Sequence, residues 1–242
     1  MQAAEMAEKL TGWLRGQLET RCARGFVVGL SGGIDSAVTV ALCKRACPEN
    51  TLGIIMPCHS DPQDAADARA AAQAFGVPVK EVILDQPFEL MVEKLTGKPY
   101  DIQEMDMSIA NIKPRLRMIT LYFFAARNRY LVVGTGNRSE LTVGYFTKYG
   151  DGGVDLLPIG NLVKSQVREL AEFLGVPRQI IDKSPSAGLW AGQCDEAEMG
   201  ITYAELDEYI LYGKGSERVK EVIETLAARN AHKNEMPACP PF

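Results

Sequence analysis

Short apolar runs that alternate with helical patterns constrain the fold of this chain more than any other feature of its 242 residues. The runs are rich in Val, Leu and Ile, which is typical of strands buried on both faces of a parallel sheet. Between them, apolar residues three and four positions apart predict amphipathic helices, which connect parallel strands by right-handed crossovers. We therefore expect an α/β fold with an open, mostly parallel five-stranded sheet, helices on both faces and a helical C-terminal extension.

The boundaries of these elements follow from the same patterns, together with Gly and Pro at their ends. Strands are expected at residues 26–30, 51–56, 79–84, 130–133 and 155–159. Helices are expected at residues 4–24, 35–47, 62–75, 109–129, 164–174, 203–212 and 217–231. The helix around Phe123 is apolar on nearly every face, which indicates burial all round, either as a central core helix or at a subunit interface.

The chain has no internal repeat, low-complexity tract or Ser- and Pro-rich linker, so we expect one domain over residues 1–242. It divides into an N-terminal helix over 1–25, a central core over 26–180, and a loop with a helical extension over 181–242. Ligands of open α/β sheets bind at the carboxyl ends of the strands, so functional residues are expected there.

Charge and cysteine content limit the classes of partner and compartment. A net charge of −5 without a long run of one sign argues against non-specific binding to nucleic acid, which requires a basic patch. The six cysteines form no CxxC pair and no zinc-type spacing, so we expect reduced thiols in a cytoplasmic protein, with a metal cluster as the alternative. The N-terminus lacks the apolar region of a signal peptide, and no apolar stretch is long enough to cross a membrane.

A glycine- and serine-rich loop follows the first expected strand and opens the next helix. It reads Gly29-Leu30-Ser31-Gly32-Gly33-Ile34-Asp35-Ser36. Free N–H groups and the positive end of the helix dipole favour a phosphate at such a helix start, and glycine lets the backbone approach it. A carboxylate beside a polyphosphate needs a cation between them, so Asp35 is predicted to bind Mg²⁺. The alternative is a plain strand-to-helix turn in which Asp35 or Ser31 caps the helix.

Other nucleotide motifs are missing from the sequence. It contains no GxxxxGK[ST], and no GxGxxG followed by an acidic residue after the next strand, so a bound dinucleotide redox cofactor is not expected. A second polar cluster follows the strand at 130–133. There Thr135 is placed to contact the nucleotide; the alternative is a structural turn residue. Glu140 is placed to join Asp35 on magnesium; the alternative is an acidic residue favoured by the dipole at a helix start.

The loop Ser31-Gly32-Gly33-Ile34-Asp35-Ser36 resembles the SGGxDS loop of the N-type ATP pyrophosphatases, which cleave ATP between its α- and β-phosphates and have a Rossmann-like fold. Longer stretches resemble one branch of that superfamily, the NAD synthetases. They are residues 134–140, residues 144–158, Lys164-Ser165-Gln166-Val167-Arg168, Lys183-Ser184-Pro185-Ser186-Ala187, Asp195-Glu196 with Tyr203, and His232-Lys233. The resemblance covers nearly the whole chain and implies that residues 26–180 are an ATP-pyrophosphatase core.

The resemblance implies a role for individual residues. Magnesium is expected at Asp35 and Glu140, and Asp35, Glu140 and Lys164 are the expected catalytic residues. ATP contacts are expected from Gly29, Leu30, Ser31, Gly32, Gly33, Ile34, Asp35, Ser36, Thr135, Lys164 and Ser186. Contacts with the second substrate, deamido-NAD, are expected from Arg115, Lys148, Asp155, His232 and Lys233. The basic residues among them would supply positive charge for two phosphorylated substrates in an acidic protein.

Two positions depart from the family's pattern. Ser186 stands where threonine is common, which keeps the hydroxyl group. Gly188 stands where the family usually has aspartate, so we expect that side chain's contact to be lost and the loop to be looser.

The implied reaction is the ATP-dependent amidation of deamido-NAD to NAD, the final step of NAD biosynthesis, through an adenylated carboxylate that releases pyrophosphate and then AMP. No nucleophilic side chain is required, and His59 is interpreted as a loop histidine beside the nucleotide rather than a base. Only about 25 residues precede the first strand, too few for a glutaminase domain, so free ammonia is the expected nitrogen source, with a separate glutaminase subunit as the alternative. The resemblance also implies a homodimer.

Two rival functions can be compared with these residues. A tRNA-thiolating or deazapurine-forming enzyme of the same superfamily would need clustered cysteines and usually a basic surface, and neither is present in the sequence. A non-catalytic adenine-nucleotide-binding module would not need Asp35 and Glu140 together with several lysines. The sequence therefore favours the synthetase.

Overall fold

The structure is a computed structural model that describes residues 2–103, 105–190 and 192–241, so positions 1, 104, 191 and 242 of the predicted domain lie outside the described residues. Within these ranges the sheet has four parallel strands in the order β3-β2-β1-β4. They are β1 (Gly25–Leu30), β2 (Thr51–Ile55), β3 (Val79–Glu81) and β4 (Tyr130–Val133).

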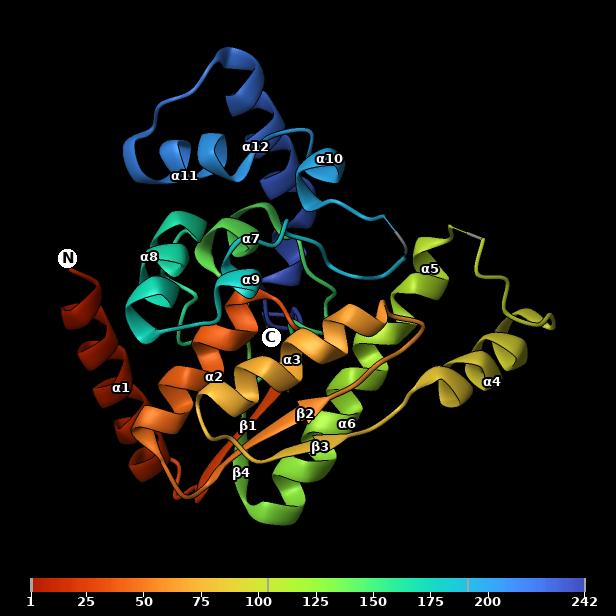
Figure 1. Ribbon diagram of the computed structural model, residues 1–242. Coiled ribbons are helices and arrows are strands. Elements are labelled where there is room, and N and C mark those ends of the chain that lie inside the picture. Colours follow the sequence, from red (N-terminus) through yellow and green to blue (C-terminus); the bar gives the residue numbers. More distant parts are fainter. Residues whose placement is uncertain (1, 104, 191, 242) are drawn as a thin grey trace.

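Helices connect the strands and continue beyond the sheet (Figure 1). They are α1 (Ala3–Thr20), α2 (Ile34–Ala46), α3 (Pro62–Ala74), α4 (Asp85–Thr96), α5 (Met107–Ala110), α6 (Ile112–Asn128), α7 (Arg138–Val143), α8 (Lys164–Leu174), α9 (Arg178–Ile181), α10 (Asp195–Met199), α11 (Tyr203–Tyr212) and α12 (Glu217–Asn230). A 3₁₀ turn, η1 (Ala231–Lys233), follows α12. None of the helices in the described ranges combines the length and the apolar character that crossing a membrane requires.

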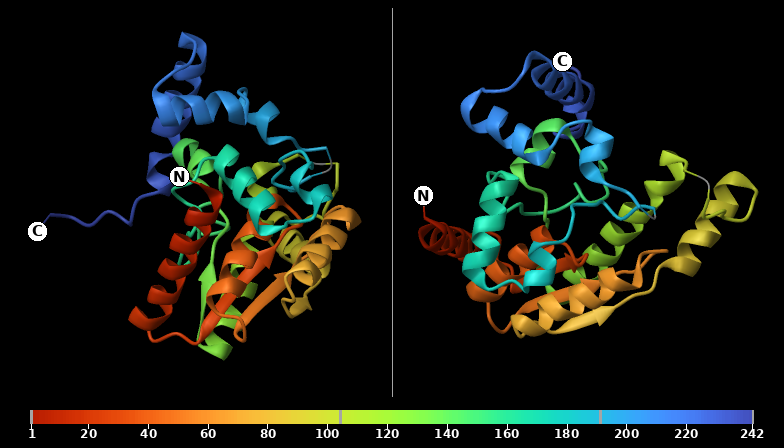
Figure 2. Two further views of the ribbon diagram at one scale, coloured as in Figure 1. Left: turned by 60° about the vertical axis from the view of Figure 1, so that its left-hand side comes forward. Right: turned by 45° about the horizontal axis from the view of Figure 1, so that its top comes forward.

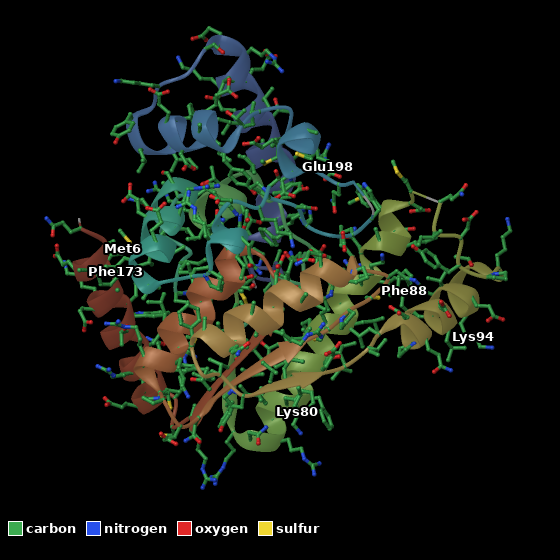
Figure 3. The ribbon with its side chains drawn as sticks, in the orientation of Figure 1. Met6, Lys80, Phe88, Lys94, Phe173 and Glu198 are labelled. Atoms are coloured by element: carbon green, nitrogen blue, oxygen red, sulfur yellow. The ribbon has the colours of Figure 1, made fainter. Side chains whose placement is uncertain are left out.

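Alternate side chains of the central strand β1 point to opposite faces of the sheet, as the strand repeat requires. Phe26 and Val28 belong to the apolar core shared with α1, α2 and α8, whereas Val27 belongs to a second core shared with α4 and α6. Both faces are therefore covered by helices, as the sequence predicts (Figure 1). Phe88 lies on the buried side of α4, and Lys94 points outward from the same helix (Figure 3).

The C-terminal extension shares a third apolar core with α7. Val143 of α7, Leu206 of α11 and Ile223 of α12 are buried together there. Helix α11 also packs against α8, and α12 packs against α7, so the extension lies over the elements that follow β4. Figure 2 shows these helices at one end of the molecule and the final C-terminal segment running away from it.

Several details of the predicted fold are wrong. The expected fifth strand at 155–159 is reduced to one parallel bridge between Val133 and Leu156, because Pro158 has no N–H to donate and residues 157–160 form a turn. The expected helix at 109–129 is divided at Asn111 into α5 and α6. Helices α4, α7, α9 and α10 were not expected, and the strand expected at 79–84 ends at Glu81. The α/β class, the parallel sheet and the other predicted elements are confirmed.

Helix α6 is not buried all round. It packs against β1 and β4, but Ile119 and Phe123 on another face are 59% and 58% exposed. Since these residues are four positions apart, they share one side of the helix. The two interpretations of its apolar sequence therefore apply to different faces: one face is core, and the other is available to a partner.

Candidate active site

The two predicted functional loops leave the sheet at its topological switch point. Strand β1 pairs with β2 on one side and with β4 on the other, so the chain reverses its direction of travel across the sheet between β1 and β4. Open α/β sheets bind ligands at that crevice, at the carboxyl ends of the strands. Residues 31–36 follow β1 and residues 134–140 follow β4, and their meeting point is the candidate active site.

The first loop has the geometry of an anion-binding turn. Gly32 has φ +82°, and a Cβ at this position would lie 2.3 Å from the Asp64 backbone oxygen, so only glycine fits. The Ser36 hydroxyl donates to the Gly33 carbonyl (2.9 Å) and fixes the loop against the helix. The residue at the helix N-cap is Gly33, which offers no side-chain acceptor to the first N–H groups of α2. Neither Asp35 nor Ser31 is the helix cap, so the anion-binding interpretation is favoured.

Asp35, Glu140 and Lys164 come together although they are far apart in the sequence. The Lys164 Nζ lies 2.6 Å from Asp35 Oδ2 and 3.7 Å from Glu140 Oε1. The three side chains are only 9% to 18% exposed. Two carboxylates thus share a single ammonium group at the switch point.

The charge balance of this cluster perturbs both Glu140 and Lys164. Burial and the neighbouring charge of Asp35 raise the pKa of Glu140 to about 8. Burial alone would lower the pKa of Lys164, but the charges of Asp35 and Glu140 raise it. With both carboxylates ionised, the cluster would hold more negative charge than Lys164 offsets, so a cation bound there would favour the ionised form of Glu140.

Asn137 organises the second loop. Its side-chain oxygen accepts the Glu140 N–H (3.0 Å), and its own N–H donates to Glu140 Oε2 (3.1 Å), which together form a capping box at the start of α7. The Asn137 amide also donates to Asp35 Oδ1 (2.9 Å). One residue therefore orients both predicted metal ligands.

The cluster opens into a cavity of about 620 Å³. Most of the predicted site residues line it, namely Gly29, Leu30, Ser31, Gly33, Ile34, Asp35, Ser36, Arg115, Thr135, Glu140, Lys148, Lys164, Ser186, His232 and Lys233. Gly32 lies in the loop behind this lining. Asp155 lies outside the lining as well: its carboxylate accepts from Tyr122 Oη (3.1 Å) and from the Val132 N–H (2.8 Å), so its contact with the second substrate stays a prediction.

The predicted second-substrate residues join the C-terminus to the loop after α7. Lys233 Nζ donates to the carbonyls of Gly144 (2.7 Å) and Phe146 (2.9 Å). Lys148 Nζ donates to the carbonyl of His232, and an Arg115 nitrogen donates to the Lys148 carbonyl (3.4 Å). These contacts hold the 3₁₀ turn at the edge of the cavity and gather the four cationic or imidazole side chains there.

The backbone of the loop that carries Ser186 accounts for the glycine at position 188. Gly188 has φ +62°, a conformation that disfavours other residues, and a Cβ there would lie 3.8 Å from Asp64 Oδ2. Asp64 is itself paired with Lys183 (2.7 Å). Glycine therefore suits both the backbone of this loop and the carboxylate that faces it.

Several residues that shape the site were missed by sequence reasoning. Lys183 lines the cavity and lies within a motif already noted, but it was given no role. Asn137 carried a signal, since Asn followed three residues later by Glu is a capping-box pattern. His59 does not belong to the described cavity lining: its ring lies against Phe88 and Tyr100, with centroids 5.7 and 4.9 Å away. Its ring is packed against aromatic side chains, and its place beside the nucleotide stays a prediction.

Comparison with known proteins agrees with this geometry. Residues 6–237 match the NAD synthase family. The NH(3)-dependent NAD(+) synthetase of Carboxydothermus hydrogenoformans is 52% identical over 237 residues, which cover 98% of this chain and 97% of that protein.

The chain belongs to the NAD synthase family. It is therefore a ligase. Among solved structures, an NMN synthetase from Francisella tularensis superimposes with a TM-score of 0.94 at 37% identity and covers all of both chains. An NH3-dependent NAD synthetase from Campylobacter jejuni superimposes with a TM-score of 0.80 at 29% identity and covers 99% of both. The fold of this NAD synthase family member is thus shared along its whole length.

Proposed function

We propose that this chain joins ammonia to the nicotinate carboxylate of deamido-NAD at the expense of ATP, yielding NAD, AMP and pyrophosphate. The observation that carries the proposal is the meeting of Asp35, Glu140 and Lys164 at the switch point, in a cavity that Arg115, Lys148, His232 and Lys233 also line. The full-length relatives named NH(3)-dependent NAD(+) synthetase support ammonia as the nitrogen donor.

ATP would lie with its β- and γ-phosphates over the loop of residues 31–36. The N–H groups at the start of α2 would bind the phosphate oxygens. Thr135 and Ser186 line the same cavity and would contact the nucleoside part. Lys164 lines the cavity and its ammonium group has three donors, so Nζ could also donate to an α-phosphate oxygen.

The residues present fit Mg²⁺ that is bound together with ATP. No group of three or more His, Cys, Asp or Glu side chains in the described ranges could hold a metal without a substrate. Mg²⁺ is usually held by one or two carboxylates together with substrate phosphates, so Asp35 and Glu140 would suffice once ATP is bound. When bound there, the ion would offset negative charge on the phosphate oxygens and on the two carboxylates.

The chemistry needs positioning rather than a nucleophilic side chain. The substrate carboxylate attacks the α-phosphorus of ATP, the bond to the β-phosphate oxygen breaks, and pyrophosphate leaves. Ammonia then attacks the acyl carbon, AMP leaves with the bonding electrons of the C–O bond, and a proton is lost from nitrogen. Lys164 stabilises charge that develops on phosphoryl oxygens, and the loop at 31–36 receives the pyrophosphate.

A second candidate substrate is the mononucleotide, nicotinate mononucleotide, which would give NMN. The superposition on the protein named NMN synthetase has a TM-score of 0.94, against 0.80 for the NAD synthetase from Campylobacter jejuni, and this difference supports the second substrate. The two reactions share the ATP site and the reacting carboxylate. They differ only in whether an AMP half must fit beside Arg115, Lys148 and Lys233.

We further propose a cytoplasmic homodimer. Ile119 and Phe123 form an exposed apolar patch on α6, here named the α6 outer face. All six cysteines are free, which suits a reducing compartment.

One assay tests these proposals. The purified chain is incubated with ATP, Mg²⁺ and ammonium, together with deamido-NAD, nicotinate mononucleotide or neither, and AMP and the amide product are measured. AMP that appears only with deamido-NAD supports the main proposal, and a higher kcat/KM for the mononucleotide supports the second. No AMP, or AMP that forms without a carboxylate substrate, would contradict both.

A further inference from the structure

One face of α11 reaches the reaction centre from the C-terminal extension. Tyr203 and Asp207 are four residues apart, so they lie on the same side of this helix, and both are buried. Their partners belong to α7, α8 and α10 and to loops beside them. None of the roles implied by the family resemblance includes either residue.

The Tyr203 hydroxyl lies between two carboxylates. Its oxygen is 3.1 Å from Asp195 Oδ2 and 3.5 Å from Glu140 Oε1. The Tyr203 ring also lies beneath the Lys164 ammonium, with Nζ 4.9 Å from the ring centroid. A single phenolic proton is thus shared between Glu140 and Asp195, while the ring contacts the cation that pairs with Glu140.

Asp195 carries the connection onward to the loop that holds Ser186. Its Oδ1 accepts the Ala187 N–H (2.8 Å) and the Tyr145 hydroxyl (3.1 Å). Tyr145 donates as well to Glu198 (2.6 Å), which lies on α10 where the extension meets the loop (Figure 3). A continuous chain of contacts therefore runs from Ser186, through its neighbour Ala187 and then Asp195 and Tyr203, to Glu140.

We propose that Tyr203 is a positioning residue that holds Glu140 in place for the metal and couples it, through Asp195, to the loop that contacts ATP. The inference rests on the proposed function, because it assigns Glu140 and that loop to the same Mg²⁺–ATP complex. Removing the hydroxyl leaves Glu140 Oε1 without this donor, so that only Oε2 is still held, by Asn137, and leaves Asp195 with one donor fewer. Partners that orient metal ligands in this way typically contribute about 10- to 100-fold to metal affinity or activity.

The test replaces Tyr203 by Phe, which keeps the ring over Lys164 and removes only the hydroxyl. Binding of Mg²⁺–ATP is measured by calorimetry without the second substrate, and NAD formation is measured as a function of Mg²⁺ and ATP concentration. We expect the Mg²⁺ concentration at half-maximal rate and the Kd of Mg²⁺–ATP both to rise about tenfold or more. Asp195→Asn should shift both values in the same direction, because it breaks the same chain of contacts.

Tyr209→Phe is the matched control. Tyr209 lies on the same helix, and its hydroxyl donates to Glu224 (3.0 Å) at the surface, away from the reaction centre. We expect its Mg²⁺ and ATP dependence to equal those of the unsubstituted protein. Thermal unfolding of all variants checks that each is folded at the assay temperature.

The outcomes separate this inference from the proposed function. If Tyr203→Phe is folded and its Mg²⁺ and ATP dependence is unchanged, the positioning role is wrong. If the unsubstituted protein binds Mg²⁺–ATP but forms no NAD or NMN, the proposed function is wrong, while the calorimetric comparison still decides the role of Tyr203. A loss of activity in Tyr203→Phe with unchanged Mg²⁺–ATP binding would also contradict the inference.

Discussion

At the scale of single residues, Asp35 is predicted to serve the proposed reaction and also contributes to the fold. Its carboxylate is paired with the nearly buried Lys164 and accepts from Asn137. A carboxylate at a helix entrance can usually be replaced without loss of folding. The structure adds a cost, since a buried ammonium would lose its nearer partner.

Asp35→Asn should therefore lower turnover by about 100-fold or more and also lower the unfolding temperature. Rates of AMP and NAD formation, with unfolding followed by circular dichroism, measure both effects. Asp182→Asn is the control, because Asp182 forms an exposed pair with Arg178 on the surface. A variant with an unchanged rate would remove Asp35 from the metal site.

Gly188 allows a second prediction at this scale. Gly188→Asp restores the family's usual residue but places a carboxylate facing Asp64 in a left-handed backbone conformation. Gly188→Asn has nearly the same size, tolerates that conformation equally well, and carries no charge. We expect KM for ATP to rise severalfold more in the Asp variant than in the Asn variant. Equal KM values would show that repulsion by Asp64 does not explain the glycine.

The sequence predicted that Asp35, Glu140 and Lys164 lie together better than it predicted their partners. Asp35, Glu140 and Lys164 stand in motifs with a local meaning, so each could be assigned separately. The contact of Asn137 with Asp35 spans 102 positions, and that of Tyr203 with Glu140 spans 63. No local pattern encodes which side chains meet across such distances, because the packing of whole elements brings them together.

At the scale of elements, α8 begins at a carboxylate supplied by another helix. The Asp207 carboxylate of α11 accepts the N–H groups of Lys164 (3.3 Å) and Ser165 (2.7 Å), as well as the Ser139 hydroxyl (2.6 Å). It satisfies donors that a helix start otherwise leaves free, and it complements the helix dipole. The position of Lys164 thus depends on the extension.

Asp207→Ala should lower the free energy of unfolding by about 1–3 kcal/mol, because buried donors lose their acceptor. Urea unfolding followed by fluorescence measures the change. Glu208→Ala, at the exposed neighbouring position, should stay within about 0.5 kcal/mol of the unsubstituted protein. A similar loss in both variants would mean that α11 tolerates substitution poorly for reasons unrelated to the start of α8.

The longer helices and the apolar strands were mostly predictable, and the short helices were not. The strands β1, β2 and β4 and the helices α1, α2 and α3 follow the apolar pattern closely. The helix α4 has apolar Phe88, Val92 and Leu95 at helical spacing, so the sequence does contain a periodic pattern that indicates this helix. The bridge at Leu156 could not be distinguished from a strand, because an apolar run indicates burial and does not indicate how many ladder bonds form.

At the scale of the whole molecule, α6 connects the substrate cavity with the surface. Arg115, Met118 and Leu121 line the cavity, whereas Ile119 and Phe123 form the exposed α6 outer face. A second copy bound to that face would lie one helix away from the predicted second-substrate residues. Association and binding of the dinucleotide are therefore expected to be linked.

Phe123→Asp should convert the proposed dimer into a monomer, because burying a carboxylate in an apolar interface is unfavourable. Light scattering coupled to gel filtration measures the mass, and kinetics on the same sample give KM for each substrate. Tyr212→Asp is the control, since Tyr212 is 69% exposed on the C-terminal extension. We expect the monomer to show a KM for deamido-NAD raised more than its KM for ATP, since α6 borders the second-substrate side of the cavity. A dimeric Phe123→Asp variant would place the interface on another surface, and a monomer with unchanged kinetics would separate association from substrate binding.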